Sequence, residues 1–181
     1  MLKYAIALTM KGKAKTGLTE LRTRFGTDMK YSIEPHVTLT YPFTPKVDIS
    51  VIENKLSEAA AQTKPFTLEL NGIRYWEGRN NVAYVAVQNQ LPVYNLHAAI
   101  VAALQGLIEG DTTFDLQHFT AHSTINEDIP GNALSAVKQE LSAHQPQYRV
   151  RITSFTLFGA ESNEKLELWK PVRVFRFPKS V

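Results

Sequence analysis

Apolar and polar positions along the chain repeat with two different periods, and the changes of period predict its elements. Alternation of period two indicates strands at residues 2–9, 66–76 and 81–88, with the turn-forming segment 77–80 joining the last two into a hairpin. Helical spacing is typical of residues 16–25, 48–61, 92–108 and 132–144. Strands at 148–159 and 165–177 are expected to form a second hairpin at the end of the chain.

Polar residues at the ends of these segments suggest where the helices begin and end. Thr16 and Asp48 are of the residue types that cap helix N-termini, and Gly26 is expected to end the first helix. Pro65 closes the second helix because its ring cannot continue one.

Two further strands, within residues 34–43 and 119–125, each contain the pattern His-x-Thr. Residues i and i+2 of a strand project from the same face, so His36 would share a face with Thr38, and His122 with Thr124. In the first copy the opposite face is apolar and suits a core. The His-Thr faces are therefore expected to line a solvated space.

The order of elements repeats in the two halves of the chain, although the residues repeat only in the His-x-Thr pair. Two similar lobes related by an approximate twofold axis would bring the two motif strands to one cleft. We therefore predict a single α+β unit over residues 1–181, bilobal, with lobes of roughly 1–90 and 91–181 in element order. Its mixed, largely antiparallel sheets would line a central cleft, with the helices outside.

Two facing histidines suit phosphoryl transfer, in which the entering and leaving oxygens lie roughly in line on opposite sides of phosphorus. One neutral imidazole can take a proton from an attacking water while the other, as imidazolium, protonates the leaving oxygen. The hydroxyls of Thr38 and Thr124 could donate to the non-bridging oxygens. The alternative is that all four are ordinary strand residues, with the threonines present for their β-propensity.

The segments 35–43 and 122–125 resemble the two signatures of the two-histidine (2H) phosphoesterase superfamily, which includes 2'-5' RNA ligase-like proteins and cyclic nucleotide phosphodiesterases. Ala121 stands where many members have proline, and Glu127 where the RNA ligase-like branch usually has arginine. The resemblance implies catalytic His36 and His122, phosphate-binding Thr38 and Thr124, and no metal or other cofactor. Further aromatic residues are expected to line the substrate site: Tyr41, Phe43 and Phe119.

The composition excludes several kinds of bond and site. The 181 residues include no cysteine, which excludes disulfides, cysteine zinc sites and thiol nucleophiles. The net charge of +3 suits an anionic ligand such as a phosphate ester, but at this value a mixed solvated surface is favoured over a dedicated nucleic-acid patch. No apolar run reaches the length of roughly 20 residues needed to cross a bilayer, and no signal peptide is evident. We expect a cytoplasmic monomer that does not bind membranes.

These observations favour a metal-independent phosphodiesterase that opens a 2',3'-cyclic phosphate of a nucleotide or an RNA end. A second possibility is a phosphodiesterase or ligase acting on 2'-5' linked oligonucleotides. A third is a non-catalytic module of the same fold that holds a nucleotide or RNA end. A metal site built from Asp115, His118 and His122 is a weaker hypothesis, because His118 and His122 would lie about 13 Å apart on a strand.

Overall fold

The computed structural model describes residues 2–26, 33–109, 118–163, 166–167 and 169–179. Its helices are α1 (Gly12–Phe25), α2 (Ile49–Gln62), α3 (Gln90–Leu104) and α5 (Leu134–Leu141). Its strands are β1 (Leu2–Thr9), β2 (His36–Phe43), β3 (Phe66–Trp76), β4 (Asn81–Val87), β5 (His122–Ile129), β6 (Gln147–Ile152), β7 (Ser154–Asn163), β8 (Leu166–Glu167) and β9 (Lys170–Arg176).

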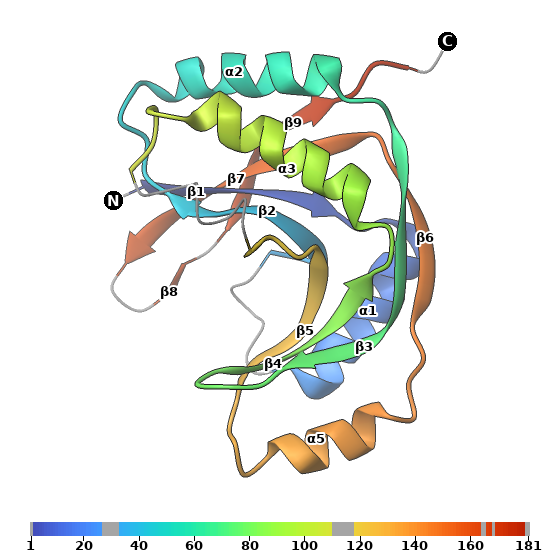
Figure 1. Cartoon of the computed structure of the whole chain (residues 1–181). Coiled ribbons are helices and arrows are strands. Elements are labelled where there is room, and N and C mark those ends of the chain that lie inside the picture. The colour runs from blue at the N-terminus through green and yellow to red at the C-terminus, as the bar shows by residue number, and fades with distance from the viewer. Residues whose placement is uncertain (1, 27–32, 110–117, 164–165, 168, 180–181) are drawn as a thin grey trace.

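The strands form two antiparallel sheets that face one another across the molecule, and the predicted α+β fold is confirmed (Figure 1). The first sheet has the order β2-β1-β7, and both β8 and β9 pair with β7. The second has the order β5-β4-β3-β6. Helices α2 and α3 pack on the first sheet through β9 and β2, whereas α1 packs on β5 and β6 of the second.

Each sheet draws strands from both halves of the chain. Strands β3 and β4 pair with β5 and β6, which come from the second half, and β7 to β9 complete the sheet of β1 and β2. The predicted division near residue 90 is therefore not the division between the sheets. The predicted strand 148–159 is also interrupted at Thr153, and its two parts, β6 and β7, enter different sheets. A run of strand-forming residues does not indicate which sheet a strand joins, because that depends on contacts with segments far away in the sequence.

Helix boundaries follow the local chemistry of the capping residues. Asp48 is the N-cap of α2, as predicted, because its side chain accepts a 2.8 Å hydrogen bond from the Ser50 amide. Thr16 is not a cap: it lies inside α1 and its hydroxyl bonds back to the Gly12 carbonyl at 3.5 Å. Gly26 ends this helix, and its amide donates to Arg22 at 2.7 Å.

One apolar core lies between the sheets' packed faces and the helices, and it includes residues of both sheets. Ile6 and Leu8 of β1, Val85 of β4 and Leu68 of β3 are all fully buried members of it. A second, smaller cluster joins Ala7, Ile33 and Phe158 on the other face of β1, with Trp169 packed against it. Within the described ranges, no helix is long and apolar enough to cross a membrane.

A similar pair of strands occurs in each of the two sheets. The β1–β2 ladder pairs Thr9 with His36 and Ala7 with Thr38, and the β4–β5 ladder pairs Ala86 with His122 and Tyr84 with Thr124. Both ladders shift register at the same two places, and β2 and β5 have the same sequence of buried and exposed positions. The approximate twofold repeat is therefore present at the level of single residue pairs.

Candidate active site

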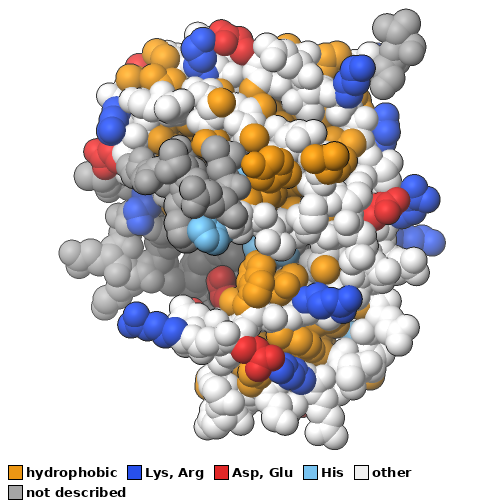
Figure 2. Space-filling view, in the orientation of Figure 1, with side chains coloured by type: hydrophobic (Ala, Val, Ile, Leu, Met, Phe, Trp, Pro, Cys, Tyr) orange, Lys and Arg blue, Asp and Glu red, His pale blue; other side chains and the backbone are white. Residues whose placement is uncertain are grey.

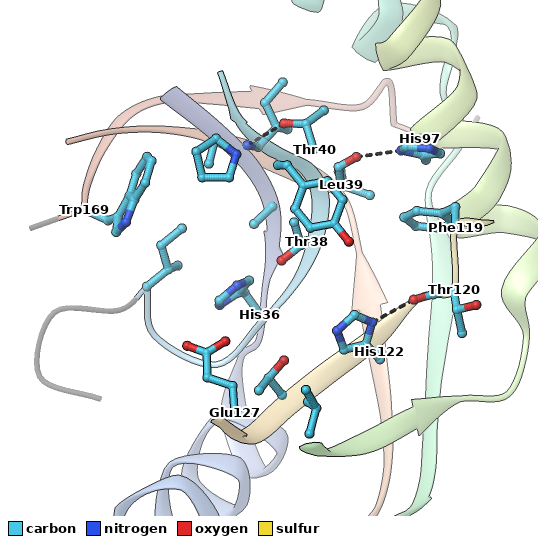
Figure 3. A pocket seen from close by; sticks show the side chains of 18 of the residues that line it. His36, Thr38, Leu39, Thr40, His97, Phe119, Thr120, His122, Glu127 and Trp169 are labelled. Atoms are coloured by element: carbon cyan, nitrogen blue, oxygen red, sulfur yellow. Dashed lines mark hydrogen bonds between the residues drawn. The ribbon is translucent and has the colours of Figure 1, made fainter. Parts of the chain in front are cut away.

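Both motif strands deliver their histidine and threonine to one cavity of about 620 Å³. His36 begins β2 and His122 begins β5, and each threonine lies two residues further along the same face. The intervening Val37 and Ser123 are buried on the opposite face. The structure thus brings together the four residues that the sequence singled out (Figure 3).

The two histidine rings are fixed in the same way. Nδ1 of His36 lies 2.8 Å from the Glu34 carbonyl oxygen, and Nδ1 of His122 lies 2.7 Å from that of Thr120. A carbonyl only accepts hydrogen bonds, so each Nδ1 carries the proton and donates it. In the neutral ring this leaves Nε2 as the basic nitrogen, with the ring orientation set by the chain two residues earlier.

Burial makes both histidines harder to protonate. It lowers the pKa of His36 from 6.5 to about 4, helped by the positive charges of Arg22 and His122 and opposed by the hydrogen bond to Glu34. Burial also lowers the pKa of His122, against the hydrogen bond to Thr120. The neutral form of both rings is therefore favoured in the unliganded protein.

A buried arginine at the cavity is a feature that the sequence analysis missed. Arg22 of α1 is only 6% exposed, lines the cavity and donates from Nη1 to the Ile33 carbonyl at 3.0 Å. Burial lowers its pKa, and the negative charge of Glu127 opposes that shift. Arg22 falls on the apolar stripe of its helix beside Leu18 and Leu21, and a charge at such a position was the available signal.

The aromatic lining differs in part from the expectation. Tyr41 and Phe119 line the cavity as predicted, and Phe119 stacks on the buried His97 ring with centroids 4.0 Å apart. Phe43 does not line it: it is 5% exposed and lies in the core against Tyr4. Phe43 has the parity of Val37 and Leu39, so alternation along β2 places it on the core face, whereas Tyr41 departs from that alternation in the part of the ladder where the register shifts.

Trp76 is a further lining residue that the sequence did not single out. Its ring lies edge-on to His122 at 4.5 Å and packs on Tyr84 at 4.2 Å. Tyr84 in turn meets His122 edge-on at 5.4 Å. Two aromatic side chains therefore enclose the His122 ring on its own sheet. Trp76 was left out of the expected lining because it lies next to a turn.

The structure gives little support to the metal hypothesis. His118 lines the cavity with an exposed side chain, and Asp115 lies outside the described residues. Among the residues that are described, no group of three or more histidine, aspartate or glutamate side chains could hold a metal ion.

Comparison with known proteins agrees with the motif geometry. The sequence profile of the 2'-5' RNA ligase superfamily matches residues 11–164, which include both His-x-Thr strands. The chain belongs to this superfamily. The resemblance to two-histidine phosphoesterases is thereby confirmed. A candidate phosphoesterase of Geobacillus kaustophilus is 26% identical over 158 residues, covering 86% of this chain and 87% of the relative.

Solved structures show the same fold. TT0787 of Thermus thermophilus aligns with a TM-score of 0.68 at 16% identity, over 97% of each chain. Escherichia coli LigT, solved in complex with 3'-AMP, aligns with a TM-score of 0.62 at 16% identity, over 98% of each chain. In both cases the likeness extends over nearly the whole length of both chains.

Proposed function

We propose that this superfamily member is a metal-independent phosphodiesterase that opens the 2',3'-cyclic phosphate of a nucleotide or an RNA end. The observation that carries the proposal is the matched pair of His-x-Thr strands, whose histidines have the same tautomer and line one cavity. Two neutral rings with a basic Nε2, one on each side of a phosphate, provide the two proton-transfer positions that in-line hydrolysis needs.

The surroundings favour His36 as the base and His122 as the acid. Burial lowers the pKa of His36, and the nearby charge of Arg22 adds to this, so the neutral form of that ring is favoured. A bound phosphodiester carries a negative charge that raises the pKa of both histidines, and His122 can then hold the proton. Neighbouring charges thus give His36 and His122 different proposed roles, although both rings make the same hydrogen bond to the backbone.

In the proposed reaction, Nε2 of His36 removes a proton from a water molecule as its oxygen bonds to phosphorus. The bond from phosphorus to one ribose oxygen breaks, and His122 gives its proton to that oxygen. The product is a nucleoside monophosphate with one free ribose hydroxyl. Thr38 and Thr124 donate hydrogen bonds to the non-bridging oxygens, where negative charge increases in the transition state.

Relatives support this substrate class. Structures of E. coli LigT have been solved with 3'-AMP, with phosphate, with ATP and with NADP+, so this fold accommodates nucleotides and their phosphates. Curated relatives are described as candidate phosphoesterases. The superfamily description favours one second candidate, a phosphodiesterase or ligase acting on 2'-5' linked oligonucleotides.

A substrate panel tests the proposal. Purified protein is incubated with 2',3'-cyclic nucleotides, RNA ending in a cyclic phosphate, and 2'-5' linked oligomers, all in excess chelator. The proposal expects opening of cyclic phosphates, absent in His36→Ala and His122→Ala. Cleavage or joining of 2'-5' linkages alone would favour the second candidate. Binding of nucleotides without any turnover would show a non-catalytic module.

A further inference from the structure

The approximate twofold repeat allows the two walls of the cavity to be compared position by position. The ladder registers match Ala5 of β1 with Val82 of β4, and Ala7 with Tyr84. The neighbouring strands match Phe158 of β7, opposite Ala5, with Trp76 of β3, opposite Val82. The histidines and threonines are the same on both walls, but the side chains behind them are not.

On the His122 wall the position matched to Ala7 is filled by the Tyr84 ring, and the cavity is lined beside it by Val82 and Trp76. Tyr84 and Trp76 pack against each other and against the His122 ring, with centroid distances of 4.2 to 5.4 Å. On the His36 wall, the methyl group of Ala7 replaces the phenol ring of Tyr84. The cavity extends into this region: it is lined there by Ala5, Ala7 and Ile33.

Two aromatic side chains border the extended region. Trp169 is half-buried, lines the cavity and packs against the cluster of Ala7, Ile33 and Phe158. Tyr41 lies on the β2 side and is 67% exposed. Figure 3 shows Trp169 across the space from Thr38 and Thr40, on the side of His36 that is away from His122.

We propose that this region, over Ala5 and Ala7 and beside Trp169, is the binding site for the planar base of the nucleotide substrate. The inference rests on the proposed function, and it adds the orientation of the substrate: the base lies on the His36 wall, because on the His122 wall the Tyr84 ring occupies the position of Ala7. A base is flat, apolar on its faces and able to stack on an indole ring.

The chemistry of the lining predicts a site that accepts many bases. Its described side chains are mainly hydrocarbon or aromatic, and the Thr40 hydroxyl already accepts a 3.1 Å hydrogen bond from the Ile6 amide. Stacking holds any base, because every base has a π-face. Purines, with two fused rings, are expected to bind more tightly than pyrimidines.

The test compares substrates with and without a base. The ratio of kcat/KM for adenosine 2',3'-cyclic phosphate to that for glycerol 1,2-cyclic phosphate is measured in the wild type, Trp169→Ala and Ala5→Leu. Removal of one stacking side chain is expected to lower this ratio roughly tenfold, and Ala5→Leu should lower it by filling the site. Val82→Leu, at the matched position of the other wall, is the control and should keep the ratio.

Binding measurements separate this proposal from the proposed reaction. Calorimetry with adenosine 3'-monophosphate and inorganic phosphate needs no turnover, so it reports on the base site even if no cyclic phosphate is opened. A roughly tenfold loss of affinity for the nucleotide relative to phosphate in Trp169→Ala supports the proposal. Two results would overturn the proposal. One is that folded Trp169→Ala and Ala5→Leu keep the wild-type ratios, and the other is that Val82→Leu lowers the ratios instead.

Discussion

His36 and His122, which lie 86 residues apart in the sequence, hold their rings by the same hydrogen bond. In each, Nδ1–H donates to the carbonyl of the residue two positions earlier, at 2.8 Å to Glu34 and 2.7 Å to Thr120. Each also begins its strand at the matched position of a repeated ladder. The repeat thus presents two rings of the same tautomer to one cavity, and differences among their neighbours can then give the two rings different roles.

Loss of either threonine hydroxyl should slow turnover without unfolding the protein. Thr38→Val and Thr124→Val keep the shape of the side chain but remove one hydrogen-bond donor to the transition state. Such a loss costs on the order of 3 kcal/mol, or about a hundredfold in kcat. Thr67→Val, on β3 and not among the cavity-lining residues, is the matched control. Full activity with a lower melting temperature would show that the motif threonines are only structural.

Acid should destabilise the fold through the two histidines. A histidine in the unfolded chain binds a proton with a pKa near 6.5, whereas folded His36 does so near 4, so the unfolded state binds more protons between these values. The free energy of unfolding therefore falls as pH drops from about 6.5 to 4, by on the order of 3 kcal/mol for His36. The lowered pKa of His122 acts in the same direction.

Urea unfolding at several pH values checks this expectation. His36→Gln removes the titrating ring, so its stability should depend less on pH over this range than that of the wild type. An equally steep dependence in His36→Gln and in His122→Gln would show that other groups cause the acid sensitivity.

His97 is expected to stabilise the first motif strand. It is 1% exposed, its Nδ1 lies 2.6 Å from the Leu39 carbonyl oxygen, and its ring stacks on Phe119. His97→Leu keeps most of the volume but leaves that buried carbonyl without its donor, which costs about 1 to 3 kcal/mol. Chemical denaturation measures the loss. Unchanged stability would mean that water or a new contact replaces the bond.

Much of the fold could be predicted because local patterns determine it. Asp48 as a cap, the hairpin of β3 and β4, and the strand β1 all depend on residues close together in the sequence. Helices α3 and α5 were also expected. Both predicted ranges, 92–108 and 132–144, extend beyond the observed C-terminal ends of these helices. The assignment of strands to sheets could not be predicted, because it depends on contacts between segments from both halves of the chain.

The site shows the same limit. The His-x-Thr spacing was sufficient to place His36, Thr38, His122 and Thr124 on cavity-facing positions. The resemblance was wrong for Phe43, which shares the parity of the buried Val37 and Leu39 and lies in the core. Other lining residues lie far from the two motifs in the sequence, and only the folded chain brings them to the cavity: Arg22, Trp76 and Trp169.

Basic side chains do not form one patch on the face seen in Figure 2, where lysine and arginine are dispersed. Hydrophobic side chains lie among them across this face, and histidine is visible near its centre. This arrangement suits a compact ligand such as a nucleotide or the end of an RNA strand better than a long stretch of its backbone.

Activity should survive exhaustive chelation. The proposed roles are covered by histidine and threonine side chains, and no cluster of three metal-ligating residues occurs in the described part of the chain. Turnover of a 2',3'-cyclic nucleotide is measured before and after dialysis against EDTA, and no change is expected. Complete loss, restored by a divalent ion, would contradict the mechanism and return attention to His118 and His122 as ligands.

The paired-histidine mechanism is tested most directly by kcat/KM against pH, measured with a 2',3'-cyclic nucleotide for the wild type, His36→Ala, His122→Ala and the double variant. The wild type should give a bell with its maximum below pH 6.5, because both histidines have lowered pKa values. Each single variant should lose nearly all activity, and the double variant should be little worse than the weaker single one.

In the residual activity of these variants, His36→Ala should lack the low-pH limb, which reports the base, and His122→Ala the high-pH limb, which reports the acid. This pattern would establish both the pairing and the assigned roles. Near-normal turnover with both limbs intact in either single variant would contradict the account.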